Sequence, residues 1–364
     1  MTRRLRLSLD AWRRLAKAVD GRRSQVKWHT DLAYSLSGIV HSSLLRLQNA
    51  SYAEALNSVT PYPPVFLLGF WRSGTTLLHE ILCCDPQFGF PSTYACLNPS
   101  HFLLTESKAG TRKAPEIKRP MDAMSYSWAS PQEDEFALLA MGAPSPYQAL
   151  IFPSLLRAPR ALVDMREHSR DDQERWLGSL HTFLRMVTVQ QRKPIVLKSP
   201  PHGYRLPLLL PEFLKAHYIV IERNPYEVFA SNLKLWRTLL ELYAVEPWTP
   251  EEIENFVLEA YLVHEEAISE GSRRASSHQL ARVRYEDIVA DPVREMERIY
   301  GELNLGNFDA VRSGVEKYRE KVSRHTRNRF VLSPAQKDRV EQCWGALINA
   351  KGYEWPAQYL KVAS

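Results

Sequence analysis

Residues 64–76, PVFLLGFWRSGTT, contain the strand, loop and helix start that decide the fold. A four-residue apolar run that follows prolines and ends in glycine predicts a buried strand at 65–68. Residues 75–84 then predict a helix that stops at Asp85-Pro86. Such a loop directs successive backbone N–H groups into one concavity at the positive end of the helix dipole. An anion of phosphate type is therefore the expected ligand.

The spacing of the loop glycines matches the Walker A frame, since four residues separate Gly69 from Gly74. Thr75, however, stands where a P-loop NTPase has its lysine, which argues against kinase or ATPase chemistry. The cation of this loop is instead Arg72. Hydroxyls of Ser73, Thr75 and Thr76 add hydrogen-bond donors. The structural alternative is a strand-to-helix turn that happens to contain glycine and threonine.

The same alternation of strand and helix signals returns later in the chain. Residues 194–198 predict a buried strand, and residues 216–222 and 281–285 predict two further strands. Helical patterns follow at 202–214, at 226–240 and after Asp291-Pro292. This order predicts an α/β fold of P-loop type, a parallel sheet with helices on both faces. Residues 100–190 and 240–280 lack strand signals and predict helical insertions over the strand ends, where such sheets bind ligands.

The composition is that of a globular protein, with 45% hydrophobic and 24% charged residues. The net charge of +6 favours anionic partners, but 47 basic against 41 acidic residues is no nucleic-acid signature. No signal peptide and no apolar run of membrane-spanning length is evident. Four cysteines, two of them the adjacent Cys83 and Cys84, form neither a disulfide framework nor a metal-ligand spacing. A reduced, cytoplasmic setting is expected.

Much of the positive charge lies in the first 27 residues. This segment predicts either a helix whose apolar face packs on the body of the protein or a basic amphipathic helix on a membrane surface. The second alternative makes a peripheral membrane contact an open prediction. We expect residues 1–60 to form a helical segment packed on the core and residues 61–364 to form a single α/β domain. The sequence predicts no particular oligomeric state.

A second anion-binding pattern lies in IERNPYEVFASNLKLW, residues 221–236. Arg223 stands at the end of a predicted strand, and Ser231 follows eight residues later on the next helix. An arginine fork can hold a phosphate in a bidentate manner, and a serine hydroxyl can add a hydrogen bond. Alone, an arginine before Asn-Pro is more often a salt-bridged residue at a strand end.

Together, RSGTT after a buried strand and R-N-P with serine eight residues beyond the arginine resemble the sulfotransferases that use 3′-phosphoadenosine 5′-phosphosulfate (PAPS). The arginine before SGTT is typical of the bacterial and tyrosylprotein-sulfotransferase-like branch. A weaker third match is VRYEDIVADP, residues 283–292. The resemblance covers roughly residues 64–350, although its motifs are three short islands.

The resemblance implies which residues bind the donor. The first loop would hold the 5′-phosphosulfate, the second pattern the 3′-phosphate, and the Y-E-D segment would lie near the adenosine. The implied donor-binding residues are Arg72, Ser73, Gly74, Thr75, Thr76, Arg223, Ser231 and Tyr285. The implied reaction moves a sulfuryl group to an acceptor hydroxyl and leaves adenosine 3′,5′-bisphosphate. It needs no metal.

Sulfuryl transfer requires in-line geometry and stabilisation of the charge on the leaving phosphate. Arg72 and the loop amides can supply that stabilisation. Lys198, at the end of the strand PIVLK, can reach the sulfuryl group or the bridging oxygen. Its structural alternative is a strand-end lysine whose ammonium reaches solvent.

A general base must take the proton of the acceptor hydroxyl, and Glu133 is the first candidate. Phe136, Ala137 and Ala140 follow at helical spacing and predict that Glu133 faces inward. The competing prediction is a capping box, with Ser130 as N-cap and Glu133 at N3. The other candidates for the general base are Glu135, as the reserve carboxylate, His202 and His101.

Two other function classes stay open, a P-loop-like nucleotide kinase and a non-catalytic nucleotide-binding protein. The acceptor is a small molecule, a lipid or sterol, or a carbohydrate, and the sequence does not choose between them. Six aromatic residues either line an acceptor pocket or belong to the core: Tyr94, Phe102, Tyr126, Trp128, Tyr147 and Phe152.

Overall fold

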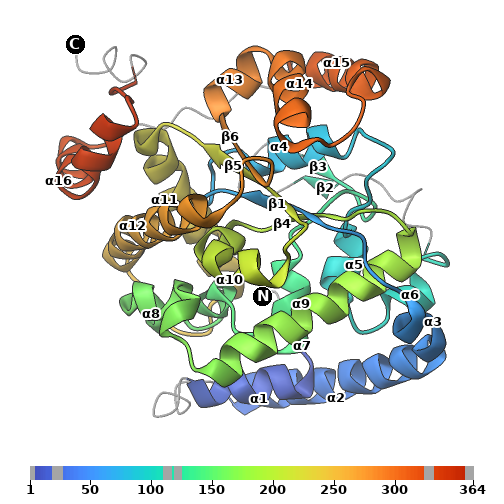
Figure 1. Cartoon of the computed structure of the whole chain (residues 1–364). Helices are drawn as coiled ribbons and strands as arrows, with labels where there is room; N and C mark the ends of the chain where they lie inside the picture. Colours follow the sequence, from blue (N-terminus) through green and yellow to red (C-terminus); the bar gives the residue numbers. More distant parts are fainter. Residues whose placement is uncertain (1–4, 19–27, 110–116, 119–124, 324–331, 357–364) are drawn as a thin grey trace.

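The structure is a computed structural model that describes residues 5–18, 28–109, 117–118, 125–323 and 332–356. Its main sheet has four parallel strands in the order β4-β1-β5-β6 (Figure 1). These strands are β1 (Val65–Leu68), β4 (Val196–Lys198), β5 (His217–Glu222) and β6 (Leu280–Arg284). β1, β4 and β5 lie within runs that the sequence predicts to be strands, and β6 begins and ends one residue before its predicted run. The predicted α/β fold with a parallel sheet is therefore confirmed.

Alternate residues of β1 and β5 enter two different cores, because successive side chains point to opposite faces of a sheet. Phe66 and Tyr218 pack with Trp176 of α9 and Leu209 of α10 on one face. On the other face, Leu67, Ile219 and Val283 pack with side chains of α4, α14 and α15. Figure 1 shows α13, α14 and α15 above the sheet and α7 and α9 below it. Burial on both faces explains why β1 and the middle of β5 are continuous apolar runs, whereas β6, at the edge of the sheet, alternates buried and exposed residues.

The helices that carry the chain between strands and across the insertions have the following bounds: α4 (Thr75–Leu82), α5 (Thr93–Leu97), α6 (Phe102–Thr105), α7 (Glu135–Met141), α8 (Pro159–Val163), α9 (Arg170–Gln191), α10 (Leu206–Glu212), α11 (Pro225–Tyr243), α12 (Pro250–Arg274), α13 (Tyr285–Ala290), α14 (Pro292–Leu303), α15 (Asp309–Ser323) and α16 (Pro334–Ala350). The predicted helix at 202–214 begins as a 3₁₀ turn, Pro200–Arg205, and continues as α10. Helix α13 starts directly after β6 and was not predicted.

The predicted insertions are mainly helical, but the first also holds a short antiparallel pair, β2 (Ile117–Lys118) and β3 (Ser125–Tyr126). Two-residue strands leave too short a pattern for a sequence to reveal. The second insertion is dominated by α12, which Thr249 and Glu252 start with a capping box.

The N-terminal segment forms α1 (Leu9–Ala18), α2 (Trp28–Ser51) and α3 (Ala53–Ser58) along the lower edge of Figure 1. Trp12 and Leu15 of α1 are buried in the core that Phe152 also joins. The apolar face of α1 thus packs on the body of the protein, as one of the two alternatives predicts. The division at residue 60 stays a prediction.

Within the described residues, no helix combines the length and the apolar character that crossing a bilayer requires.

Candidate active site

The loop between β1 and α4 has a backbone that glycine makes possible. Arg72 and Gly74 both have positive φ, 69° and 105°, a conformation that costs a non-glycine residue about 1–2 kcal/mol. A Cβ on Gly69 would lie 2.8 Å from the carbonyl oxygen of Ile221, and one on Gly74 would lie 2.4 Å from the Tyr285 ring. Both positions therefore require glycine, because neighbouring atoms leave no space for a Cβ. Positive φ at two positions of the loop is compatible with the anion-binding concavity that the sequence predicts.

A buried hydroxyl in the loop has no hydrogen-bond partner among the described residues. The Ser73 side chain is 2% exposed, and its Oγ is unpaired. Burying a hydroxyl without a partner costs about 1–3 kcal/mol. The neighbouring Thr75 is also buried at the first turn of α4. A phosphate or sulfate oxygen in the loop would satisfy Ser73, so the residues present fit the anion that the sequence predicts.

The second predicted anion pattern lies directly beside this loop. Arg72 Nε donates a hydrogen bond to Ser231 Oγ over 2.8 Å, and Arg223 Nη1 donates to the carbonyl oxygen of Arg72 over 3.3 Å. The Arg223 guanidinium stacks 4.3 Å from the centre of the Tyr285 ring. The strand ends of β1, β5 and β6 thus bring the predicted donor-binding residues together, although 159 positions separate Arg72 from Ser231.

Arg223 is held by more than these contacts. Its Nε and Nη2 donate to Glu227 Oε2 over 2.9 and 2.6 Å, one turn along α11. The arginine is therefore salt-bridged at a strand end, which is the structural alternative, and also faces the loop, which is the functional one. Both descriptions apply to the same side chain.

Lys198 and Glu133 form an ion pair on the other side of the loop. Lys198 ends β4 and pairs in register with Leu67 of β1, which brings it beside the start of the loop. Its Nζ lies 2.9 Å from Glu133 Oε1, and the two side chains are 2% and 12% exposed. The alternative of an ammonium that reaches solvent is wrong, since Lys198 is buried. The predicted lysine and the first-choice carboxylate are direct partners.

Two aromatic residues connect this pair to the loop. Tyr147 donates its hydroxyl hydrogen to Glu133 Oε2 and accepts a hydrogen bond from Trp71 Nε1 over 3.1 Å. Burial, and then the negative charge of Glu133, raise the pKa of Tyr147 well above its usual value. The sequence offered Tyr147 only as one of six pocket aromatics. It lies in a short 3₁₀ turn, Pro146–Leu150, which has no periodicity to mark it.

The predicted capping box at Ser130 does not form. Helix α7 starts at Glu135, with Asp134 as N-cap, so Glu133 precedes the helix. Ser130 Oγ accepts instead from the backbone N–H of Ser127. Pro131 bridges to Ser92, and the Gln132 N–H donates to the carbonyl of Pro91. Contact with this neighbouring segment thus keeps Pro131 and Gln132 out of a helix. The side chain of Glu133 is left free for Lys198 and Tyr147.

The reserve carboxylate is engaged elsewhere. Glu135 is fully buried and accepts from both terminal nitrogens of Arg205 over 2.6 and 2.9 Å. Arg205 also stacks on Trp176, 4.3 Å from the ring centre. A buried bidentate pair of this kind has its charges matched. Glu135 is thus a structural residue beneath the site.

The two candidate histidines differ in burial and in partners. His202 has no exposed surface, and its Nε2 lies 2.7 Å from Asp134 Oδ2. Burial opposes ionisation of Asp134, but the charge and hydrogen bond of His202, with a hydrogen bond from Ser199, outweigh it and lower the pKa of Asp134. His101 contacts Thr105 and stacks on His41. Neither histidine has a hydrogen bond to Lys198 or Glu133 among the described contacts.

His79 was not predicted as a site residue. It lies on α4, is 1% exposed, and its Nε2 has no partner among the described residues. Burial, and then the positive charge of Lys198, lower its pKa to about 3. The imidazole is therefore neutral at physiological pH. In the sequence His79 follows Thr75 and Thr76 on a predicted helix, and no local pattern there indicates that its side chain lies near Lys198.

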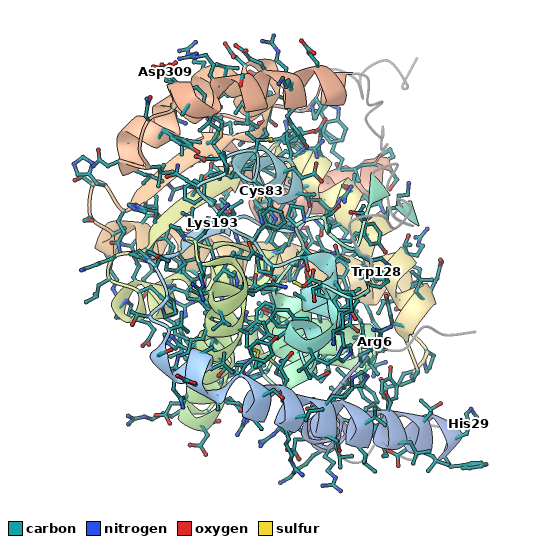
Figure 2. All side chains as sticks on the ribbon, turned by 90° about the vertical axis from the view of Figure 1, so that its right-hand side faces the viewer. Arg6, His29, Cys83, Trp128, Lys193 and Asp309 are labelled. Atoms are coloured by element: carbon teal, nitrogen blue, oxygen red, sulfur yellow. The ribbon has the colours of Figure 1, made fainter. Side chains whose placement is uncertain are left out.

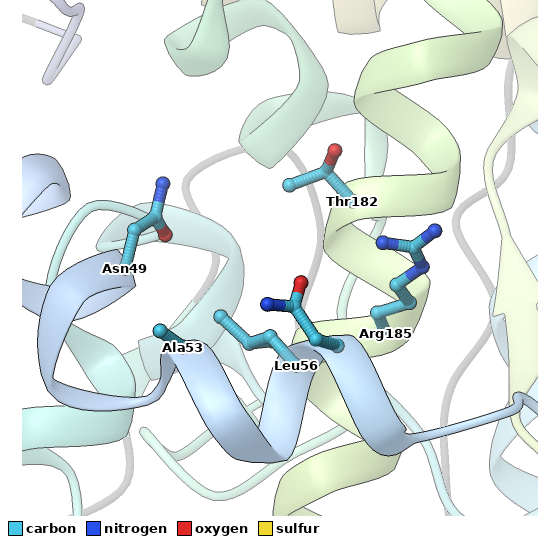
Figure 3. A pocket seen from close by; sticks show the side chains of 6 residues that line it. Asn49, Ala53, Leu56, Thr182 and Arg185 are labelled. Atoms are coloured by element: carbon cyan, nitrogen blue, oxygen red, sulfur yellow. The ribbon is translucent and has the colours of Figure 1, made fainter.

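The six candidate pocket aromatics do not line one cavity. Phe102 and Phe152 are fully buried in two different cores. Tyr94 and Trp128 contact each other edge to face, 5.8 Å apart. A surface hollow of about 230 Å³ lies between α3 and α9 (Figure 3), away from the ends of β1, β5 and β6 that carry the predicted site residues. Its lining includes Asn49, Leu56 and Arg185 and no predicted site residue.

Comparison with known proteins gives one consistent result. A family model described as the sulfotransferase family matches residues 63–310. Omega-hydroxy-beta-dihydromenaquinone-9 sulfotransferase Stf3 of Mycobacterium bovis is 32% identical over 349 residues, 95% of this chain and 90% of its own. The protein of the same name from Mycobacterium tuberculosis matches equally well.

Solved structures share the fold. The sulfotransferase STF1 from Mycobacterium tuberculosis superposes with a TM-score of 0.62 at 19% identity, over 85% of this chain and 87% of that one. STF9 from Mycobacterium avium gives a TM-score of 0.62 at 18% identity, over 96% of this chain and 98% of that one. At such identities the likeness concerns the fold alone.

Proposed function

The chain belongs to the sulfotransferase family and is a transferase, and from this premise we propose that it moves a sulfuryl group from PAPS to the hydroxyl of a lipid-like acceptor. The observation that carries the proposal is the Lys198–Glu133 pair, buried beside a loop built to hold an anion. One positive and one negative side chain at that place suit a reaction that stabilises a leaving group and removes a proton.

In this proposal two groups of residues hold the donor. The loop residues Arg72, Ser73, Gly74, Thr75 and Thr76 hold the 5′-phosphosulfate. The unpaired Ser73 Oγ and the positive φ of Gly74 support this assignment.

Arg223 and Ser231 hold the 3′-phosphate, and Tyr285 lies against the adenosine. The contacts that join Arg223 and Ser231 to Arg72 support a donor that carries two separated anionic groups. ADP lacks a 3′-phosphate and would leave Arg223 without a ligand group.

The chemical roles follow from charge and position. PAPS supplies, when bound, a sulfuryl group on a phosphate leaving group. Lys198 and Arg72 stabilise the negative charge that develops on the leaving oxygen, because preorganised cations in a site of low dielectric cost no reorganisation. Glu133 takes the proton from the acceptor hydroxyl as that oxygen bonds to sulfur. Tyr147 and Trp71 keep the Glu133 carboxylate oriented.

The acceptor we propose is an alcohol on an apolar chain. The name of the Mycobacterium bovis relative identifies its acceptor as an omega-hydroxylated dihydromenaquinone. Aromatic rings surround Glu133 in this chain, where Phe136 stacks on Tyr147 at 5.0 Å and Tyr147 contacts Trp71. An apolar surround suits a lipid or isoprenoid alcohol better than a carbohydrate.

The experiment presents PAPS and a panel of alcohols to the purified full chain. The panel contains a hydroxylated isoprenoid quinone, a sterol, a phenol and a monosaccharide, and mass spectrometry detects the sulfate ester and adenosine 3′,5′-bisphosphate. We expect the ester from the isoprenoid alcohol. An ester from the monosaccharide alone would overturn the acceptor class. Phosphoryl transfer from ATP in place of any ester would identify a kinase, and bisphosphate binding without turnover a nucleotide-binding protein.

A further inference from the structure

The outward side of α2 carries large apolar side chains that nothing in the described structure covers. Along this helix the exposed fractions are Trp28 76%, Leu32 48%, Leu36 56%, Ile39 50%, Val40 56% and Leu47 56%. Their spacings of mostly three or four residues place them on one side of the helix. We call these six residues the α2 outer face. Figure 2 shows α2 along the lower margin of the molecule, with His29 near its outer end.

The side of α2 that faces the protein is less apolar than the side that faces away. Its buried residues are Tyr34, Gly38 and Gln48. A Cβ on Gly38 would lie 2.8 Å from the Leu9 backbone, so α1 crosses α2 there in close contact. A surface helix normally turns its apolar stripe toward the core. In α2 the stripe is turned outward, which is typical of an interaction surface.

Basic side chains accompany this surface. Helix α1, which packs antiparallel to α2, exposes Arg13, Arg14 and Lys17 while Trp12 and Leu15 are buried. Arg46 is exposed on α2 itself. The acidic residues described on the two helices are Asp10 and Asp31, and Asp31 accepts a hydrogen bond from Trp12 Nε1 over 2.8 Å. The hairpin of α1 and α2 therefore combines an apolar face with a positive charge.

We propose that the α2 outer face docks on the surface of an anionic lipid bilayer. Apolar side chains on one face and flanking cations are the two features that hold a helix in a membrane interface. With 24 residues, α2 extends over about 36 Å at 1.5 Å per residue, enough to lie along the headgroup boundary. Trp28 at its start suits the same boundary, where indole rings concentrate.

A second copy of this chain is a less suitable occupant. Pairing two α2 outer faces would bring Arg46 and the cations of α1 close to those of the other copy, and like charges oppose such contacts. An anionic bilayer satisfies both the apolar residues and the cations. Docking would keep an enzyme that acts on a lipid alcohol at the surface in which that alcohol is dissolved. The docking itself does not depend on the proposed chemistry.

The test measures co-sedimentation of the full chain with vesicles of phosphatidylcholine alone and of phosphatidylcholine with 30–40% phosphatidylglycerol. The first variant changes Leu32, Leu36 and Leu47 together to glutamine, which has a helix propensity close to that of leucine. We expect at least a tenfold loss of binding to the anionic vesicles, since three apolar side chains lose their burial. Circular dichroism checks that the helix content is kept.

A matched control and a charge variant complete the design. Leu214→Gln changes a leucine that is 77% exposed on another part of the surface, and its vesicle binding should equal that of the wild type. Replacing Arg13, Arg14 and Lys17 with glutamine should cost about fivefold per cation on anionic vesicles and little on neutral ones.

Two results would overturn the proposal. One is vesicle binding that the three leucine changes leave intact. The other is a dimer in sedimentation velocity without lipid that the same changes dissociate, because the α2 outer face would then be an interface between copies. A failure of sulfuryl transfer leaves both readouts unaffected, so the two proposals fail separately.

Discussion

Lys198 and Glu133 are each other's ionic partner, with 2.9 Å between Nζ and Oε1, in a site where neither side chain is more than 12% exposed. Removing one member of a buried pair leaves an uncompensated charge and costs about 3–5 kcal/mol. A truncation such as Lys198→Ala would therefore mix a loss of stability with any loss of catalysis. A change that keeps the volume and the hydrogen bond of the side chain, such as Glu133→Gln, limits the loss of stability, and measuring stability beside kcat separates the two effects.

The assignment of Arg223 to a 3′-phosphate predicts a selective loss of affinity. Arg223→Ala should weaken adenosine 3′,5′-bisphosphate about 10- to 100-fold more than adenosine 5′-phosphate, because a charged hydrogen bond contributes about 1.5–3 kcal/mol. Isothermal titration calorimetry measures both ligands. Arg237→Ala, an exposed arginine on the same helix, serves as the control and should change neither Kd. Equal weakening of both ligands by Arg223→Ala would remove the 3′-phosphate from this side chain.

The loop backbone predicts that Gly74 cannot be replaced. In Gly74→Ala the new Cβ meets the Tyr285 ring at a residue whose φ is 105°. We expect at least a tenfold loss of bisphosphate affinity, because the loop and Tyr285 must both shift. Gly301→Ala is the matched control, since a Cβ there meets nothing within 4 Å and lies in α14. That change should raise stability by about 0.5–1 kcal/mol and leave the Kd unchanged.

The inner strands of the sheet were predictable because β1 and β5 are buried on both faces, so the runs 65–68 and 218–221 are apolar without interruption. That the residues we propose for donor binding lie side by side was predictable, because the strand ends of β1, β5 and β6 meet at one edge. At Glu133 the local sequence pattern predicts the wrong backbone structure. Ser130 and Glu133 have the spacing of a capping box, yet the neighbouring segment at Pro91 and Ser92 keeps the intervening backbone out of a helix.

Other features depend on contacts that no local pattern contains. Tyr147 reaches Glu133 from a short 3₁₀ turn, and His79 is buried beside Lys198 through the packing of α4 against β4. The outward apolar side of α2 has the same periodicity as a buried one, so the sequence alone cannot tell which side faces the core.

A carboxyl buried on α12 predicts a pH dependence of stability. Burial opposes ionisation of Glu265, but the His264 hydrogen bond and the charge of Lys351 outweigh it and lower its pKa to about 2 from 4.5. The folded state therefore binds this proton less readily than the unfolded state does. The stabilisation, about 3 kcal/mol, is complete above pH 4.5 and is lost as the pH falls toward 2.

Urea unfolding of wild type and Glu265→Gln measures this contribution. The variant should be less stable at pH 7, and the difference should narrow as the pH falls from 5 to 3. Glu266→Gln is the control, since Glu266 is 51% exposed in its pair with Arg160 and such surface pairs contribute about 0–1 kcal/mol. A difference between wild type and Glu265→Gln that stays constant over this range would contradict the lowered pKa.

The role of Glu133 as general base gives the most decisive prediction. In Glu133→Gln an amide oxygen can still accept a hydrogen bond from Lys198, so the protein should lose less stability than a truncation would cost, stay folded and keep its Kd for bisphosphate. Glutamine cannot take a proton at neutral pH, and kcat should fall about 10²- to 10⁴-fold, the usual contribution of a positioned base. Tyr147→Phe is the matched control, because it removes one hydrogen bond to the carboxylate and keeps the carboxylate itself. Its kcat should fall less than tenfold. Combining Glu133→Gln with Lys198→Met should cost less than the sum of the two changes in activation free energy, because the residues act as a pair. Wild-type turnover by a folded Glu133→Gln protein would exclude this carboxylate as the base, and with Glu135 bound to Arg205 the search would move to His202 and His79.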